Sequence, residues 1–221
     1  MKSFTDYLAE GINDPAIFKA VFLAGGPGSG KSFIVGKTAL TALGFKVINS
    51  DNAFENALKK AGLSMDPEDI FSVKGQEIRK SAKAITGKKM DLALLGRLGL
   101  VIDGTGKDYP KIQSQAQKLR ALGYDVAMIF VNTDLETAMD RNQARARSLP
   151  DDQVQKMWND VQKNIGKFQN FFGRNMFIVD NSTDANWEGA TNSIYKRIGQ
   201  WSKEEPKSPI AKKWMKSQRN K

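Results

Sequence analysis

The residues with the clearest chemistry form a glycine-rich stretch near the start of the chain. Gly25, Gly30, Lys31 and Ser32 complete the spacing G-x-x-x-x-G-K-[ST], between an apolar run and a helix-like segment. Glycines there let successive backbone N–H groups curl around a phosphate, and the helix that follows presents its positive dipole end to the anion. The pattern predicts a Walker A phosphate loop whose nucleotide-binding residues are Gly25, Gly26, Pro27, Gly28, Ser29, Gly30, Lys31, Ser32 and Phe33.

Two side chains of this loop have separate roles in the prediction. Lys31 would reach the β- and γ-phosphates of a nucleotide, which makes it a predicted catalytic residue. The Ser32 hydroxyl would take one coordination position on Mg²⁺, a hard ion that prefers oxygen ligands and shares them with nucleotide phosphates. We therefore expect ATP and Mg²⁺ as cofactors.

Composition limits the remaining chemistry. The 221 residues include no cysteine, which excludes disulfides and cysteine metal sites, and no histidine, which leaves carboxylates, lysines and arginines for catalysis. The sequence has no apolar run of membrane-spanning length, and its N-terminus does not show a secretory signal. We expect a cytoplasmic protein without a membrane partner.

Strand-like and helix-like segments alternate along the chain. This alternation predicts an α/β fold with a five-stranded parallel sheet, helices on both faces and right-handed crossovers, and the Walker A loop makes it a P-loop NTPase fold. Ligands of such a sheet bind beyond the carboxyl ends of its strands. The expected strands are 21–24, 45–49, 100–102, 126–131 and 176–179.

Local signals set the expected helix ends. Gly44 is expected to end the helix after the phosphate loop, and Gly87 to interrupt a later helical region. Asn52 and Glu55 have the spacing of a capping box at the start of a helix. Further helices are expected over 110–122, 135–147, 151–171 and 187–201.

Two carboxylates follow expected strands at the ligand-binding edge. Asp51 could accept the proton of an acceptor hydroxyl; the alternative is a carboxylate that caps a helix or serves its dipole. Asp103 could hold Mg²⁺ directly or through water; the alternative is a carboxylate that satisfies the glycine turn after it. We predict Asp51 as the catalytic base and Asp103 as a metal residue.

The residues after the third strand favour phosphoryl transfer over hydrolysis. Asp103 is followed by Gly104, where P-loop proteins that hydrolyse a nucleotide for motion commonly have a water-activating acidic residue. The chain also lacks the Asn-Lys-x-Asp run that reads guanine in GTPases, the nearest candidate being 131–134. By elimination, transfer to a bound acceptor is favoured.

The cations for such a transfer lie in the stretch DRNQARARS. Arg141 and Arg145 are four residues apart on one helix face and are predicted catalytic residues, while Arg147 is predicted to bind the nucleotide. The alternative is a solvated basic face. Because Pro150 and a second helix follow, the region 135–171 is predicted to form a helical lid over the nucleotide.

Half of the net charge of +10 lies in the C-terminal tail. Residues 203–221 contain seven Lys/Arg and two Glu and have the composition of a flexible or weakly helical extension beyond the core. One interpretation is a solubilising terminus. The other is a nucleic-acid or partner contact in which Trp214 stacks on a base.

The order GGPGSGKS, INSD, VIDGTG and DRNQARARSLPDDQVQKM resembles the P-loop kinases related to the kinase domain of phage polynucleotide kinase and to zeta toxins. The resemblance covers about 20–157 and the fifth strand. The segment after the fourth strand points to this group, because it matches the pattern R-N-x-x-R with a later proline and apolar residues. The matching residues are Arg141, Asn142, Arg145, Pro150, Val154 and Met157.

The resemblance implies a role for each matched residue. Lys31 and Ser32 would bind phosphate and Mg²⁺, Asp51 would be the acceptor base, and Asp103 would lie by the metal or substrate. The lid arginines would be Arg141, Arg145 and Arg147. Two departures concern the acceptor: no arginine follows the base in 52–56, and lysine and tyrosine stand after the third strand where the family often has arginine.

We therefore predict a P-loop kinase domain over 1–202 that transfers the γ-phosphoryl group of ATP to a hydroxyl acceptor, with a basic tail over 203–221. The candidate acceptors are a polynucleotide 5′-hydroxyl, a nucleotide sugar and a nucleoside or other small metabolite. The alternative is a nucleotide-dependent module that binds nucleic acid or protein with little catalysis. By resemblance, a phage-encoded kinase acting in the host cytoplasm would fit; the oligomeric state is left open.

Overall fold

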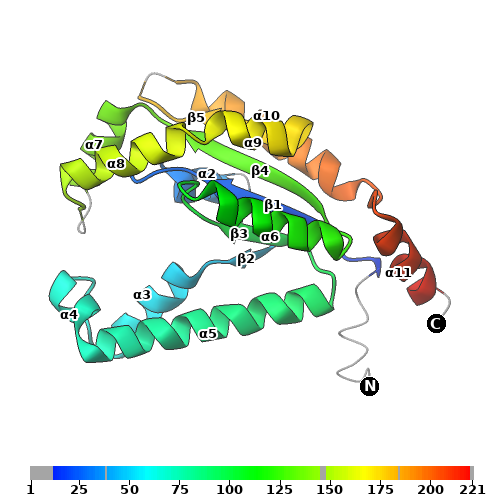
Figure 1. Cartoon of the computed structure of the whole chain (residues 1–221), viewed down its shortest axis with the longest axis horizontal. Coiled ribbons are helices and arrows are strands. Elements are labelled where there is room, and N and C mark those ends of the chain that lie inside the picture. The colour runs from blue at the N-terminus through cyan, green and yellow to red at the C-terminus, as the bar shows by residue number, and fades with distance from the viewer. Residues whose placement is uncertain (1–11, 38, 145–147, 184, 220–221) are drawn as a thin grey trace.

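The computed structural model describes residues 12–37, 39–144, 148–183 and 185–219 (Figure 1). Its strands are β1 (Lys19–Ala24), β2 (Lys46–Ile48), β3 (Leu100–Asp103), β4 (Asp125–Asn132) and β5 (Met176–Asp180). They form one parallel sheet in the order β2-β3-β1-β4-β5. The predicted α/β class and five-stranded parallel sheet are confirmed.

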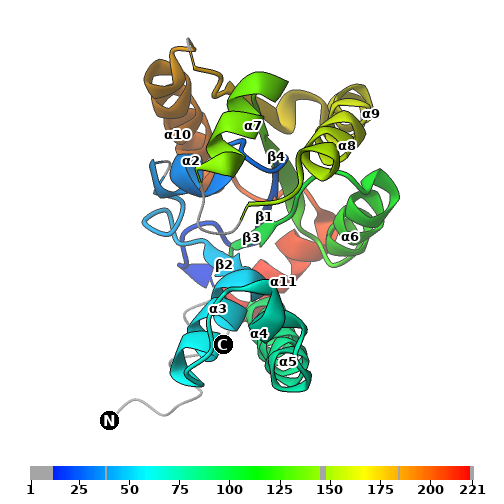
Figure 2. The same cartoon turned by 90° about the vertical axis from the view of Figure 1, so that its left-hand side faces the viewer.

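Helices cover both faces of this sheet. They are α2 (Lys31–Lys37), α3 (Ser50–Lys60), α4 (Pro67–Phe71), α5 (Val73–Leu95), α6 (Tyr109–Ala121), α7 (Leu135–Gln143), α8 (Asp151–Gln162), α9 (Ile165–Phe172), α10 (Trp187–Lys203) and α11 (Pro209–Arg219). Figure 2 shows α2 and α10 on one side and α6, α8 and α9 on the other, with α3, α4 and α5 as a helical unit beside β2. In the described ranges, no helix combines the length and apolar character needed to cross a bilayer.

The central strand β1 is buried along its whole length because it lies between β3 and β4. Its side chains alternate between two cores. Phe22 packs on the side of α6 and α9, with its ring centroid 5.8 Å from that of Phe172, whereas Val21 and Leu23 pack on the side of α2 and α10. Full burial of such a side chain stabilises the fold by about 1.5–3 kcal/mol. The loop after β1 therefore starts from a rigid strand.

The helix after the phosphate loop is shorter than predicted. It ends at Lys37 and not at Gly44, and residues 39–44 form turns. The chain folds back there because Leu40 and Phe45 both enter the core, and Phe45 N donates to Leu40 O at 3.2 Å. Gly44 has the left-handed φ of +92° that a chain-reversing glycine adopts, but it ends a turn.

Two other helix predictions are wrong. The helix α5 runs through Gly87 without a break, because the cost of about 1 kcal/mol for a glycine inside a helix is small beside the packing of α5 on α3. The helix α3 is capped by Asn49, whose Oδ1 accepts from Asp51 N at 2.7 Å, and not by Asn52. Asn49 directly follows β2, so the short connection fixes the helix start.

The C-terminal segment is not an extension beyond the core, which corrects the prediction. The helix α11 packs against the sheet end through Ala211 and Met215, which are buried. The Trp214 ring makes an edge contact with Phe18 at a centroid distance of 5.4 Å, so it is engaged in packing and is not held out for stacking on a base. Apolar residues at helical spacing among the lysines provide this packing face.

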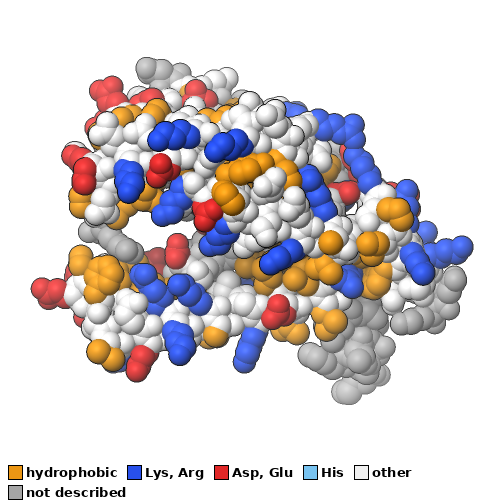
Figure 3. Space-filling model, viewed as in Figure 1, with side chains coloured by type: hydrophobic (Ala, Val, Ile, Leu, Met, Phe, Trp, Pro, Cys, Tyr) orange, Lys and Arg blue, Asp and Glu red, His pale blue; other side chains and the backbone are white. Residues whose placement is uncertain are grey.

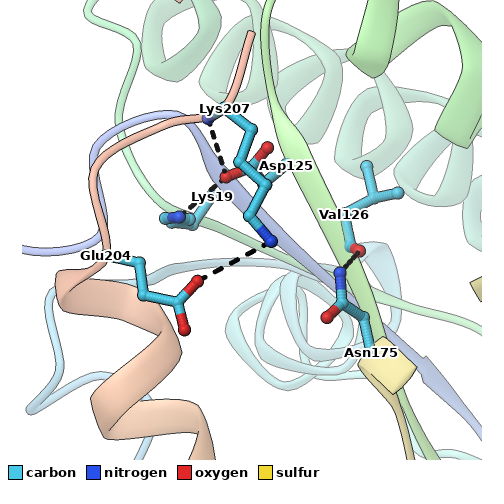
Figure 4. A network of polar contacts seen from close by, with 6 residues as sticks. All are labelled: Lys19, Asp125, Val126, Asn175, Glu204 and Lys207. Atoms are coloured by element: carbon cyan, nitrogen blue, oxygen red, sulfur yellow. Dashed lines mark hydrogen bonds and ion pairs between the residues drawn. The ribbon is translucent and has the colours of Figure 1, made fainter. Parts of the chain in front are cut away.

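A polar network holds the segment between α10 and α11 against the sheet (Figure 4). The buried Lys19 Nζ lies 2.8 Å from Asp125 Oδ2, and the same oxygen accepts from Lys207 N at 3.3 Å. Lys19 Nζ also lies 5.0 Å from the centroid of the Trp201 ring. Removing one partner of a buried pair costs about 3–5 kcal/mol because the other charge stays buried. The network therefore ties β1 and β4 to the C-terminal segment.

Trp214→Ala tests whether α11 is part of the fold. We expect it to lower the free energy of unfolding by about 2–4 kcal/mol, because the ring fills space against Phe18. Urea denaturation measures the change. Lys213→Ala, at an exposed neighbouring position, serves as control and should change stability by less than about 0.5 kcal/mol. Equal midpoints for the two variants would contradict the packing described here.

Candidate active site

The phosphate loop is braced by two neighbouring elements. Gly28 and Gly30 have φ values of +73° and +75°, which favour glycine. A Cβ at Gly28 would collide with the backbone of Ala138 in α7, and a Cβ at Gly30 would collide with the side chain of Asn181 after β5. Asn181 Nδ2 also donates to Ser29 O at 2.8 Å. Conformation and space together require glycine at both positions.

Lys31 connects the loop to the neighbouring strands. Its Nζ donates to Gly104 O at 2.9 Å and lies 3.0 Å from Asp103 Oδ1, while Asp103 Oδ2 accepts from Asn49 Nδ2 at 2.6 Å. The side chains of Lys31 and Asp103 are each 17% exposed, so the pair is shielded from solvent but still open to a ligand. One chain of polar contacts thus joins the carboxyl ends of β1, β2 and β3.

A cavity of about 440 Å³ opens over the loop. Its lining brings together the loop, both predicted carboxylates and residues from the region of α7 and α8. The lining residues are Gly25, Gly26, Pro27, Ser29, Lys31, Ser32, Asn49, Asp51, Asn52, Asp103, Thr105, Asn142, Leu149 and Met157. Sequence positions far apart in the chain therefore meet at the predicted edge of the sheet.

The lining fits nucleotide phosphates and Mg²⁺. Ser29 Oγ is a buried hydroxyl without a hydrogen-bond partner in the part of the chain that is described. Lys31 offers a cation, and Ser32 and Asp103 offer the oxygen ligands that Mg²⁺ prefers. Among the predicted loop residues, Gly28, Gly30 and Phe33 do not line the cavity: the two glycines shape the loop, and Phe33 lies with its ring centroid 4.8 Å from that of Trp187.

Asp51 lies in the first turn of α3, where its negative charge interacts favourably with the positive end of the helix dipole. The N-cap of the helix is Asn49 and not Asp51. Its backbone N–H is taken by Asn49, but its exposed carboxylate has no hydrogen bond or ion pair within the described ranges. The carboxylate borders the same cavity as Lys31. Its position is open to an acceptor hydroxyl, and its role as a base stays a prediction.

Of the three predicted arginines, Arg141 lies among the described residues. Arg141 on α7 donates from Nη1 to Asn181 O at 2.8 Å, so it lies against the phosphate loop but does not line the cavity. Arg145 and Arg147 lie outside the described residues. Contact of these guanidinium groups with phosphate stays a prediction.

Asn142 fixes the two ends of the arginine-bearing loop. This buried side chain accepts from Leu149 N at 3.0 Å and donates to Leu149 O at 2.8 Å. From the sequence, Asn142 was predicted only as a match to a family pattern, and Asn49 only as part of the INSD motif; neither structural role was predicted. Both are asparagines whose partners lie across a turn or a strand, a relation that spacing alone does not reveal.

The region predicted as a lid, 135–171, is held by contacts of its helices α8 and α9 with the sheet and its loops. Trp158 Nε1 donates to Thr133 O at 2.8 Å, and Asn164 Nδ2 donates to Gly106 O and Lys107 O at 3.0 and 2.9 Å. The helix α9 is separate from α8 and packs Phe168 into the core. Among the described residues of this region, Asn142, Leu149 and Met157 border the cavity, and lid closure stays a prediction.

The family model AAA_33, described as an AAA domain, matches residues 21–164. The chain belongs to this family. The matched range includes the phosphate loop, Asp51, Asp103 and Arg141. The resemblance to P-loop kinases that was predicted from the sequence is confirmed. No curated protein matches the sequence significantly.

Solved structures share the fold at low sequence identity. The PezAT chromosomal toxin–antitoxin system of Streptococcus pneumoniae gives 18% identity and a TM-score of 0.57, over 90% of this chain and 94% of that chain. The AvrRxo1-ORF1:AvrRxo1-ORF2 complex gives 17% identity and a TM-score of 0.59, over 81% of this chain and 60% of that chain. The Pnkp1/Rnl/Hen1 RNA repair complex gives 21% identity and a TM-score of 0.52, over 68% of this chain and 46% of that chain. These likenesses establish the P-loop fold of the AAA_33 chain.

Gly28→Ala tests the bracing of the phosphate loop. The added methyl group would both strain the left-handed backbone and collide with Ala138, so we expect the affinity for ATP to fall by at least about tenfold. Titration with a fluorescent ATP analogue measures this affinity. Gly36→Ala is the control, because a Cβ there meets nothing within 4 Å. An unchanged affinity in Gly28→Ala would refute the geometry of the loop.

Proposed function

We propose that this AAA_33 protein is an ATP-dependent kinase that transfers the γ-phosphoryl group to a hydroxyl acceptor. One observation supports the proposal above all: the carboxylate of Asp51 borders the same cavity as Lys31 and Ser32 of the phosphate loop. A carboxylate that has no hydrogen bond or ion pair among the described residues, and that lines the cavity over the phosphate loop, suits a base that receives the proton of an acceptor.

The proposed reaction is a direct displacement at the γ-phosphorus of ATP. The acceptor hydroxyl oxygen forms a bond to the γ-phosphorus, its proton passes to Asp51, and the bond from the γ-phosphorus to the β–γ bridging oxygen breaks to release ADP. Lys31 would leave Gly104 O and Asp103 to hold phosphate oxygens, which frees Asp103 Oδ1. Ser32 and Asp103 would hold Mg²⁺, which neutralises phosphate charge when bound.

The arginines of the α7–α8 region would complete the charge balance. Arg141 is held beside the loop by Asn181 O, and Asn142 anchors the loop that contains Arg145 and Arg147. We propose that these guanidinium groups neutralise the negative charge that develops during transfer. Gly104 stands after Asp103, so the position of a water-activating carboxylate is not filled, which favours an acceptor over water.

Transfer of labelled γ-phosphate tests the function. The protein is incubated with Mg²⁺ and γ-labelled ATP beside 5′-hydroxyl oligonucleotides, nucleotide sugars, nucleosides or water alone. A labelled acceptor supports the kinase. Label found only as free phosphate, or found nowhere despite ATP binding, would contradict it and favour a nucleotide-dependent binding module.

Asp51→Asn tests the base. We expect transfer to the acceptor to slow by about 10²–10⁴-fold, because the amide cannot take the proton, while ATP affinity stays the same. Single-turnover label transfer and nucleotide titration measure the two quantities. Glu55→Gln makes the same chemical change one helical turn later on α3, outside the cavity, and should keep the parent rate. Near-parent transfer by Asp51→Asn would leave Asp51 with only a helix-dipole role.

A further inference from the structure

A second cavity, of about 210 Å³, lies on the other side of Asp51. It is lined by Ser50, Asp51, Phe54, Arg79 and Lys83. Asp51 therefore borders both this cavity and the one over the phosphate loop. A molecule that offers a hydroxyl to Asp51 would place its adjoining atoms in the second cavity.

Two cations of α5 dominate this second cavity. Arg79 and Lys83 are four residues apart and so share one face of the helix. Within the described ranges, neither forms an ion pair with a carboxylate. Figure 3 shows Lys and Arg side chains gathered over α3 and α5, beside the hollow that separates this unit from α7 and α8. The unpaired positive charge favours an anionic ligand.

The surrounding structure fixes where these cations lie. The Arg79 guanidinium carbon is 4.7 Å from the centroid of the buried Phe54 ring, which orients the planar group. The helices α3 and α5 share a small core that contains the fully buried Leu58. Lys89 Nζ donates to Val47 O at 3.0 Å and so ties α5 to β2. The cavity wall is thus joined to the strand that leads to Asp51.

We propose that the acceptor carries a phosphate group close to its reactive hydroxyl, and that Arg79 and Lys83 bind this phosphate. The inference rests on the proposed kinase function for its acceptor. A guanidinium group can hold two phosphate oxygens, and the positive end of α3 lines the same cavity through Ser50. A neutral sugar or nucleoside would leave two cations in a cavity whose one acidic lining residue is Asp51. Of the three candidate acceptors, the polynucleotide and the nucleotide sugar therefore fit, and an uncharged metabolite does not.

The anion site can be tested apart from catalysis. Inorganic phosphate is titrated by calorimetry into protein whose phosphate loop is filled with Mg²⁺ and a non-hydrolysable ATP analogue. We expect Arg79→Ala and Lys83→Ala each to weaken phosphate binding by about tenfold or more. Lys83 is exposed, so Lys83→Ala should leave the fold intact. It therefore still tests the site if Arg79→Ala fails to fold. Lys80→Ala, next in sequence to Arg79 but outside the cavity, is the control and should bind like the parent.

The prediction that the acceptor carries a phosphate is tested with pairs of compounds that differ only in this phosphate or nucleotide group. Label transfer is compared for a nucleoside 3′-phosphate and its nucleoside, and for a nucleotide sugar and its free sugar. We expect a lower KM for the phosphorylated member, a rise in that KM of about tenfold or more in Arg79→Ala, and an unchanged KM for ATP. No phosphate binding by the parent, or equal binding by Arg79→Ala, Lys83→Ala and the parent, would overturn the site. Phosphate binding that depends on both cations, with no labelled acceptor, would support the site and reject the kinase.

Discussion

The contact of Lys31 Nζ with Gly104 O and Asp103 is the interaction on which the site depends. It joins the loop after β1 to the end of β3, and Asn49 extends the connection to the end of β2. On the opposite flank, Asn181 and α7 hold the glycine turns of the same loop. The loop is therefore shaped before a phosphate arrives, and binding would exchange one partner of Lys31 for another without rebuilding the backbone.

The strand order explains why two cavities meet at one carboxylate. The helical unit α3–α5 is inserted between β2 and β3, and the α7–α8 segment lies between β4 and β5. Both insertions leave the sheet at its carboxyl edge, on either side of the loop after β1 (Figure 1). Asp51 stands at the start of the first insertion, so it faces the nucleotide side and the α5 side at once. In the proposed reaction, this place would put Asp51 between the nucleotide and the acceptor.

Sequence alone predicted the features that depend on local pattern. The five strands are short apolar runs, and the phosphate loop is a contiguous motif, so both could be located without tertiary information. The docking of α11 was missed because its Lys-rich composition outweighed a narrow apolar face. The course of α5 through Gly87 and the cavity around Arg79 depend on packing between segments far apart in sequence, which periodicity does not report. Composition also gave no sign that Asn142 would close a loop.

A crystal structure of the protein with Mg²⁺ and a non-hydrolysable ATP analogue would show whether Lys31 and Asp51 face the same γ-phosphate. We predict that Lys31 Nζ leaves Gly104 O for the β- and γ-phosphate oxygens, and that the γ-phosphate faces the carboxylate of Asp51. A nucleotide bound away from the loop, or one whose γ-phosphate points away from Asp51 while Lys31 keeps its contacts, would contradict it.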